Sequence, residues 1–508
     1  MDTDMDLDIA ALVQPHQVHR DIYLDPGIFA REMRSLWARS WLFVGHDSQV
    51  PQAGDYITTQ LADQPVLMLR REDGQIGVLL NRCAHKGSTL CTQASGHAGR
   101  FLRCPYHGWS YRLDGSLLGL PLKAGYAGAD FAQAPAQRGL TPYGEVAVHR
   151  GFVFARAQAP QPARAGGAAA APDFQASLGP LLGLLDLLAD RSPLGRLQVA
   201  GGIIRTQVRA NWKIYLENIN DAVHPVTTHA SATQSAQAVW AQQPADAVKP
   251  AALQQLLPFG SGYEFFDRMG ARLLPGGHTV LGTQASLHAA YAELPGYAEA
   301  LATAHGPQRA REVLAFAPQN VVFYPGMALK GVPQVMRVIR PLAVDHTVVE
   351  AWAFQPAGAP AALLESALLY NRQVFSPLSP VAHDDLHLFE GLQRGLAARG
   401  NPWVSLHRGA GVGAVMAAKA SDAPGASDAS GLPREVSGTD EALLRHQYQA
   451  WAALMTEERP QADDIRRPPP EGVEQSGRAT FPQEAAEEAH GEGAGPQARQ
   501  AAAGRLAG

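Results

Sequence analysis

The chain has 508 residues, of which 46% are hydrophobic, so it can bury more than one core. Its formal net charge of −5 argues against the basic surface that nucleic-acid binding requires, and 3 cysteines are too few for a disulfide framework. The acidic N-terminus resembles no signal peptide and no long apolar run predicts a membrane span, so we expect a cytoplasmic protein that binds neither nucleic acid nor membrane.

The N-terminal segment, residues 1–45, predicts helices. Hydrophobic residues recur at helical spacing from Phe29 to Trp37, and Asp25 followed by Pro26 is typical of a helix start. We expect this segment to pack against the C-terminal domain of the chain.

Two domains are predicted after this segment. Residues 46–157 predict an all-β domain, because short apolar runs alternate with turns rich in Gly, Asp and Asn. An Ala-, Pro- and Gly-rich linker is expected over 158–174. The larger domain, 175–456, mixes helices with strands: 320–356 predicts consecutive antiparallel strands, and 361–396 predicts helix.

Two segments predict little regular structure. A stretch rich in Gly, Ala and Ser over 409–438 predicts a mobile loop. The end of the chain, 457–508, has few aromatic residues and predicts disorder, since it cannot bury enough apolar surface to offset its ordering entropy.

Two short segments of the β domain each bring one cysteine and one histidine. Cys83 and His85 form the first pair, and Cys104 and His107 form the second. A Rieske [2Fe–2S] cluster holds one iron with two thiolates and the other with two imidazoles. Two β loops that each supply both residue types therefore match its ligand set.

The alternative for this quartet is a zinc site. Common zinc fingers pair like ligands, whereas each arm here mixes a cysteine with a histidine, which favours the iron–sulfur cluster. Gly87 and Gly108 allow tight loops, and Trp109 and Tyr111 can shield a cluster from water. The remaining cysteine, Cys91, is expected to be a small core residue.

A helix in the larger domain predicts a second metal site. If it is continuous, it places Glu217, Asp221 and His224 on one face. We expect a break at Pro225, because the residue before a proline avoids helical geometry. Such a break would let the imidazoles of His224 and His229 converge.

Two histidines and one carboxylate on one face of a metal form the facial triad of non-haem Fe(II) oxygenases, which leaves positions open for dioxygen and substrate. The carboxylate is expected from a helix that begins at Ser379-Pro380. Asp385 shares the apolar face of this helix, whereas Asp384, about 100° away, is expected to face solvent or the helix N-terminus. The alternative is that the histidines are ordinary core or surface residues and that both aspartates merely favour the helix dipole.

At these motifs the chain resembles the Rieske non-haem iron oxygenases, specifically the large (α) subunit of aromatic-ring-hydroxylating dioxygenases. The cluster motif reads CAH and then CPYHGWSY, the catalytic motif reads NWKIYLENINDAVHPVTTHAS, and the late carboxylate motif reads DDLHLFEGLQRGL. The resemblance covers about residues 20–400. The gap between the cluster arms is slightly longer than the family's usual one, which suggests a small insertion near 95–100.

The resemblance implies an α+β protein. An all-β Rieske domain would precede a catalytic domain with a curved antiparallel sheet flanked by helices, the helix-grip or START-like arrangement. The quartet would hold the [2Fe–2S] cluster, and a mononuclear Fe(II) would be held by His224, His229 and Asp385.

The resemblance also implies roles for other residues and for partners. Asn218 matches a residue near the iron, and Asp221 matches the acid that bridges, across a subunit boundary, to a cluster histidine, here His107. We expect a homotrimer, with or without a small β subunit, that takes electrons from NADH through a reductase, with or without a ferredoxin. With dioxygen it would cis-dihydroxylate an aromatic substrate.

The substrate pocket is expected along 320–356, where Arg337 could bind a substrate carboxylate bidentately. The equal alternative is that Arg337 or Arg340 pairs with a structural acid. Other functions that stay open are a Rieske monooxygenase or N/O-demethylase and, in another class, a Rieske electron-transfer protein, which would leave the larger domain unexplained. No convincing G-x-G-x-x-G fingerprint is present, so NADH is expected to bind a partner.

Overall fold

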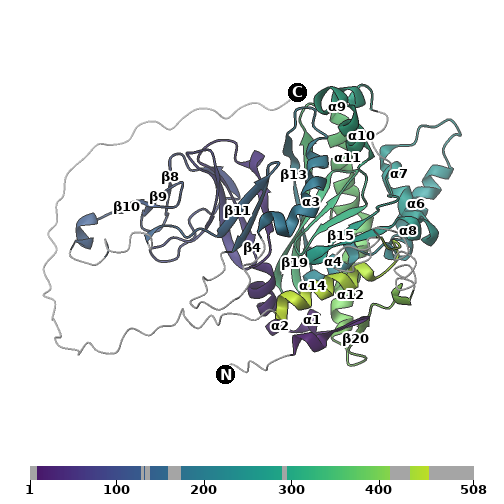
Figure 1. Cartoon of the computed structure of the whole chain (residues 1–508), viewed down its shortest axis with the longest axis horizontal. Coiled ribbons are helices and arrows are strands. Elements are labelled where there is room, and N and C mark those ends of the chain that lie inside the picture. Colours follow the sequence, from purple (N-terminus) through teal and green to yellow (C-terminus); the bar gives the residue numbers. More distant parts are fainter. Residues whose placement is uncertain are drawn as a thin grey trace, which may run out of the picture. The chain divides into compact units, whose positions relative to one another are not determined.

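The computed structural model describes residues 8–127, 131, 138–157, 173–288, 294–411 and 435–456 (Figure 1). The expected disorder over 457–508, and most of the expected linker and of the expected mobile loop before it, lie outside these residues. Among the described residues, no helix is both long enough and apolar enough to cross a membrane.

The N-terminal segment is helical, as predicted, after a short strand pair. Its elements are η1 (Ile9–Leu12), β1 (Val13–Gln14), β2 (Gln17–His19), α1 (Asp21–Leu24), α2 (Pro26–Glu32) and a π turn, η2 (Met33–Trp37). The Asp25 carboxylate accepts hydrogen bonds from the backbone N–H groups of Gly27 and Ile28, and Pro26 lies in the first turn. Helix α2 therefore begins where its cap and its proline predict.

Three small antiparallel sheets form the β region that carries the Cys/His pairs. The first sheet has the spatial order β11 (Gly144–His149), β12 (Phe152–Ala157) and β3 (Leu42–His46). The second has the order β6 (Ile76–Leu80), β5 (Gln64–Arg70), β4 (Asp55–Leu61) and β7 (Ser95–His97). The third has the order β10 (Leu117–Gly119), β9 (Ser110–Arg112) and β8 (Phe101–Arg103). Two 3-10 turns, η3 (Asp47–Gln49) and η4 (Lys123–Tyr126), lie between strands. One Cys/His pair follows β6 and the other follows β8.

A seven-stranded antiparallel sheet forms the centre of the larger region. Its order is β13 (Leu197–Val208), β19 (His346–Pro356), β18 (Val335–Ala343), β17 (Met327–Lys330), β16 (Asn320–Phe323), β15 (His278–Leu281) and β14 (Ala271–Leu274). The strands from β16 to β19 are consecutive in sequence and antiparallel, which confirms the prediction for 320–356.

The two faces of this sheet belong to different cores, because successive side chains of a strand point to opposite faces. On β16, Val321 packs in the core that contains Leu181 of α3 (Phe174–Ala189) and Phe43 of β3. Its neighbour Val322 packs in the core that contains Trp212 of α4 (Trp212–Ile219). The second face is the one that positions the metal-site helices.

The other helices of the larger region connect and cover this sheet (Figure 1). They are α5 (His224–Thr228), α6 (Ala230–Ala241), α7 (Ala251–Leu256), η7 (Leu257–Gly260), α8 (Tyr263–Arg268), η8 (Pro275–Gly277), α9 (Tyr297–His305), α10 (Pro307–Ala315), α11 (Ala361–Tyr370), η9 (Asn371–Phe375), α12 (Pro380–Leu396) and α14 (Ala442–Thr456). The strand β20 (Trp403–Ser405) pairs with β2.

The helix predicted over 361–396 is interrupted. It runs through α11 and the π turn η9, stops at Phe375 and restarts as α12 at Pro380. The Ser379 hydroxyl accepts a hydrogen bond from the Ala382 N–H at 3.1 Å, which confirms the predicted cap. The interruption follows from that cap, because a capping residue lies outside the helix it begins.

Candidate metal centres

The loops that carry the Cys/His pairs share one backbone pattern. In the first, the Cys83 N–H donates to the Ser88 carbonyl at 2.8 Å, and the Gly87 N–H donates to the Cys83 carbonyl at 2.9 Å. The second loop repeats both bonds around Cys104 and Gly108. The two glycines have φ angles of +74° and +72°, which other residues rarely adopt.

The four side chains of the quartet converge from these loops. The rings of His85 and His107 lie 4.7 Å apart between centroids. The thiols of Cys83 and Cys104 are buried and free. Burial raises the pKa of Cys104, but backbone hydrogen bonds from Tyr106 and His107 outweigh it, so the pKa lies below the ordinary thiol value.

Aromatic residues shield the Cys/His quartet, as expected. Trp109 stacks on His85 at 4.8 Å with an interplanar angle of 4°, and the Tyr111 hydroxyl lies 3.1 Å from the Cys83 sulfur. In the described part of the chain, Nδ1 of His85 is buried without a hydrogen-bond partner. Two free thiols and two imidazoles, one with such an orphaned nitrogen, fit a Rieske cluster. Cys91 is half-buried.

The helix that leads to the second site ends earlier than predicted. Helix α4 stops at Ile219, and a short turn separates it from α5, which begins at His224. Oδ1 of Asp221 accepts a hydrogen bond from the backbone N–H two residues on, at 2.7 Å, and so stabilises the turn. The break predicted at Pro225 is wrong: this proline lies in the first turn of α5, where its missing N–H costs nothing.

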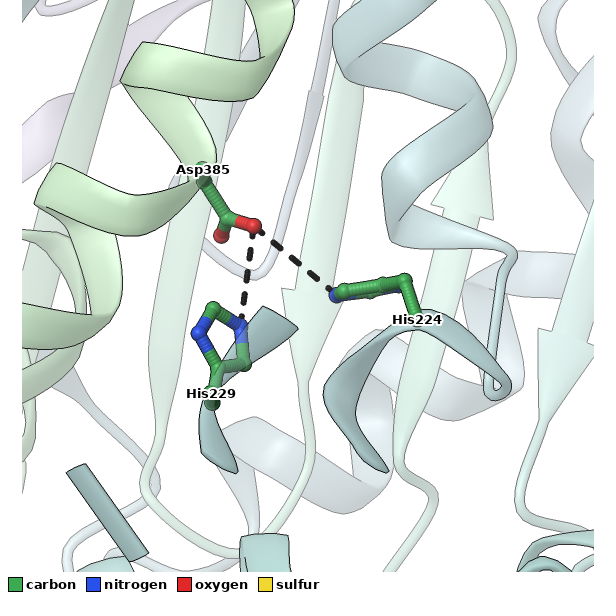
Figure 2. Close-up of side chains that lie close together, drawn as sticks. All are labelled: His224, His229 and Asp385. Carbon is green, nitrogen blue, oxygen red and sulfur yellow. Dashed lines mark ion pairs between the residues drawn. The ribbon is translucent and has the colours of Figure 1, made fainter. Parts of the chain in front are cut away.

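His224, His229 and Asp385 nevertheless meet, between α5 and α12 (Figure 2). Oδ1 of Asp385 lies 3.5 Å from Nε2 of His229 and 3.9 Å from Nε2 of His224, and one ligand atom of each residue lies within 4.8 Å of the others. Nδ2 of Asn218 lies 3.1 Å from Nε2 of His224 and 3.3 Å from Oδ1 of Asp385. This donor set fits a facial triad, with Asn218 at its edge.

A second carboxylate lies near the other ring nitrogen of each histidine. Oδ2 of Asp221 is 3.6 Å from Nδ1 of His224, and Oδ2 of Asp384 is 3.5 Å from Nδ1 of His229. Such outer carboxylates orient imidazoles that bind metals. The expectation that Asp384 faces solvent or the helix N-terminus is wrong, because α12 lies beside His229 and brings Asp384 to one ring nitrogen and Asp385 to the other.

The charges at this site suit a cation. Burial lowers the pKa of His229, so its imidazole is neutral at neutral pH and can bind a metal. Burial raises the pKa of Asp385, although both histidines oppose this, and a metal cation would reverse the balance. Burial also acts to raise the pKa of Asp221, but His224, a backbone N–H and Arg408 outweigh it and lower that pKa. Asp221 is therefore ionised.

Glu217 lines one cavity together with Asp221 and His224, but its carboxylate meets tyrosine hydroxyls instead of the triad histidines. Its Oε1 accepts hydrogen bonds from the hydroxyl groups of Tyr23, at 2.7 Å, and of Tyr448. Burial raises the pKa of Glu217 to about 7, although both tyrosines oppose this. The physical reason is the early end of α4, which takes Asp221 and His224 out of helical register with Glu217.

Arg337 lines a cavity together with the triad. It is buried, and its Nη2 donates to Oδ1 of Asn320 at 2.6 Å. Among the described residues, no acid lies within ion-pair distance of Arg337, whereas Arg340 lies 3.5 Å from Glu350. The alternative of a structural acid therefore applies to Arg340.

Lys330, which was not among the predicted site residues, lines the same cavity from β17. A signal was present: a lysine at the end of an apolar predicted strand lies where buried residues are expected, and lysine is almost never buried without a reason. It was missed because the identity of its neighbours depends on the pairing of strands, which a single strand does not reveal.

Two family models match the chain. Residues 40–132 match the Rieske [2Fe-2S] domain, and residues 196–457 match the ring hydroxylating alpha subunit (catalytic domain). The quartet lies in the first match, and His224, His229 and Asp385 lie in the second.

Individual proteins show the same likeness. Toluate 1,2-dioxygenase subunit alpha of Pseudomonas putida is 27% identical over 390 residues, which are 76% of this chain and 80% of the relative. The N,N-dimethyl phenylurea N-demethylase subunit alpha of a Sphingobium species is 32% identical over 216 residues, 42% of this chain and 44% of the relative. A naphthalene 1,2-dioxygenase from Rhodococcus sp., solved with indole bound, has the same fold, with a TM-score of 0.68, 22% identity and coverage of 87% of this chain and 95% of that one.

Proposed function

Because the chain belongs to the ring-hydroxylating alpha subunits that carry a Rieske domain, we propose that it uses dioxygen and NADH-derived electrons to cis-dihydroxylate an aromatic ring. It is the terminal oxygenase subunit of an aromatic-ring-hydroxylating dioxygenase, an oxidoreductase. Members of this family are oligomeric and work with separate electron-transfer partners.

The observation that carries the proposal is the meeting of His224, His229 and Asp385 beside a cavity. A Rieske cluster supplies single electrons, and a mononuclear iron supplies the place at which dioxygen is activated. The chain's own residues prepare that place. Asp221 and Asp384 lie within ion-pair distance of the outer ring nitrogens of His224 and His229, where they can orient the two imidazoles.

We assign to Asp221 the role of a bridge between the two centres. It is ionised, lies beside His224, and its side chain is 25% exposed, so a group from outside can reach it. Among the described residues, its ion pairs are with His224 and Arg408 of its own chain, and no cluster histidine contacts it. A bridge to His107 of a neighbouring subunit accounts for this, and we propose a homotrimer, with or without a small β subunit.

The proposed partners are the proteins that supply electrons and the substrate itself. We propose that a reductase oxidises NADH and passes electrons to the cluster, directly or through a ferredoxin. Arg337 is proposed to contact the substrate, since it is buried in the wall of the cavity that the triad lines.

The test is an isotope experiment with the reconstituted system. Iron-loaded protein is mixed with a surrogate reductase, NADH, ¹⁸O₂ and a panel of neutral and acidic aromatics. We expect a cis-dihydrodiol that contains both labelled oxygen atoms and is formed in step with NADH consumption. Asp385→Ala is the matched control: it should retain the cluster spectrum and form no product. Failure of every aromatic to yield a doubly labelled diol contradicts the proposal.

A second function has one observation in its favour, the likeness to an N-demethylase subunit. If this chain is a monooxygenase or an N- or O-demethylase, the same assay should give a product with one labelled oxygen atom, or formaldehyde from an N-methyl or O-methyl substrate. An electron carrier alone is excluded, because the larger region matches a catalytic domain.

A further inference from the structure

Two cations are buried near each other in the wall of the cavity beside the triad. Lys330 and Arg337 are each 4% exposed. They lie on neighbouring strands, where Lys330 pairs with Val335 and Arg337 pairs with Ala328. This register places the two cations diagonally across the strand pair and on one face of the sheet. Both line the cavity that the triad lines.

Neither cation has an acidic partner among the residues that the structure describes. The Lys330 ammonium donates to the Gln319 carbonyl at a long 3.4 Å and lies 5.6 Å from the centroid of a tyrosine ring. The Arg337 guanidinium donates to Asn320 at 2.6 Å and lies 4.8 Å from the centroid of a phenylalanine ring. Nε of Arg337 is buried without a hydrogen-bond partner.

Two other buried cations, Lys213 and Arg340, have acidic partners within the chain. The Lys213 ammonium lies 2.5 Å from Glu32, and the Arg340 guanidinium lies 3.5 Å from Glu350. A buried charge costs free energy unless an opposite charge or hydrogen bonds compensate it. Burial, with a second cation nearby, lowers the pKa of Lys330 well below its usual value. An anion that enters the cavity would oppose this shift in the pKa of Lys330 and favour its charged ammonium form.

We propose that Lys330 and Arg337 together bind the carboxylate of an aromatic acid and thereby select the substrate class; this inference rests on the proposed function. The planar guanidinium can hold both carboxylate oxygens, and the ammonium adds a point charge. The cavity has apolar and aromatic walls, among them Phe259 and Phe375, which suit a ring. The ring then occupies the space that the triad also lines.

The test measures binding, with two probes of the same shape and different charge. Benzoate and nitrobenzene are titrated into anaerobic, iron-loaded oxygenase by calorimetry. The wild type should bind benzoate at least about tenfold more tightly. Lys330→Met and Arg337→Gln should each weaken benzoate binding by about tenfold and leave nitrobenzene binding within about twofold. A second pair, 2-naphthoate and 2-nitronaphthalene, repeats the comparison for a larger ring.

The controls separate charge from packing. Lys249→Met makes the same change outside the cavity, where Lys249 lies 5.0 Å from the Trp240 ring, and it should leave both probes unaffected. Lys330→Arg keeps the charge and should keep the preference for the acid. If Lys330→Met does not fold, the wild-type comparison and Lys330→Arg still decide the matter.

Two results would overturn the inference. The first is that the wild type binds the acid no more tightly than its neutral partner in either pair. The second is that Lys330→Met weakens the binding of benzoate and of nitrobenzene equally. These failures are distinct from failure of the proposed function. Dihydroxylation of neutral aromatics without any preference for acids would remove the selectivity alone. Acid-selective binding without oxygenation of any aromatic would remove the function alone.

Discussion

The acidic residues around the triad differ in role because their surroundings differ. Asp385 faces Nε2 of both histidines, whereas Asp221 and Asp384 each lie near one Nδ1. Glu217 is half-buried and meets two tyrosine hydroxyls instead of a cation. One kind of functional group thus supplies a proposed ligand, two orienting groups and a carboxyl that titrates near neutral pH.

Glu217 predicts a specific dependence of stability on pH. Its pKa is about 7 in the folded protein, against an ordinary value of 4.5. The folded state therefore holds a proton that the unfolded chain has released. The stabilisation from this bound proton is complete below the ordinary pKa of 4.5 and is lost as the pH rises through the folded-state pKa of about 7. The free energy of unfolding falls by about 3 kcal/mol over this range.

Glu217→Gln removes this titration and keeps an oxygen that accepts from both tyrosines. Between about pH 4 and pH 8, the free energy of unfolding of the wild type should fall by about 3 kcal/mol more than that of the variant. Urea denaturation of both proteins at each pH measures this difference. Parallel stability profiles for the two proteins would show that Glu217 does not titrate in that range.

At the scale of elements, α12 decides where the third proposed ligand lies. The helix begins at Pro380 under the Ser379 cap, and its second turn carries Asp384 and Asp385 to the two ring nitrogens of His229. A frayed first turn would loosen both contacts, because the side-chain cap replaces one of the backbone acceptors that a helix start lacks.

Ser379→Ala tests this dependence. It should cost about 1 kcal/mol of stability and speed the loss of the mononuclear iron to a chelator, while the absorbance of the cluster stays unchanged. Ser379→Thr keeps the hydroxyl and serves as the control. Equal rates of iron loss in the alanine variant and the wild type would show that the cap does not affect how firmly the iron is held.

At the scale of the whole molecule, segments that are distant in sequence hold the iron-site helix. Glu32 of α2 accepts hydrogen bonds from Trp212 at 2.8 Å, from Lys213 at 2.5 Å and from Trp451 of α14 at 2.7 Å. The start of α4 is thereby joined to elements near both ends of the described chain. Breaking a buried network of this kind leaves uncompensated charge, which is strongly destabilising.

The proposed bridge between subunits predicts rescue in mixed oligomers. One chain carries Cys104→Ser and lacks the cluster, and the other carries Asp385→Ala and lacks the iron. Each variant alone should be inactive. Oligomers assembled by co-expression should regain part of the activity, because an intact cluster then lies beside an intact iron site of another chain.

The matched control places Asp221→Asn in the chain that keeps its iron. This change should leave both metal centres loaded and abolish the rescue, because the asparagine carries no charge to hold a cluster histidine. Inactive mixed oligomers would mean that electrons pass within one chain, and rescue despite Asp221→Asn would remove Asp221 from the route. NADH-dependent turnover and iron content are the measurements.

Much of the fold was predictable because local patterns carry it. Residues 320–356 predicted consecutive antiparallel strands, which the structure confirms. Asp25-Pro26 and Ser379-Pro380 predicted helix starts that cap as expected. The domain boundaries and the roles of the site residues stay predictions. The break between α4 and α5 was predicted at Pro225 but lies one turn earlier. There the Asp221 side chain accepts a hydrogen bond from the backbone and so competes with helix formation.

What this sequence determined by itself is the chemistry: the kinds of ligand, their spacing and the loops and helices that carry them, because these depend on neighbours in the chain. What only the tertiary structure decided is which groups share a buried space. Asp384 against His229, Glu217 between two tyrosines, and Lys330 beside Arg337 each join residues from different elements. Burial sets the charge and the partners of such groups, and burial is a property of packed elements that no single segment contains.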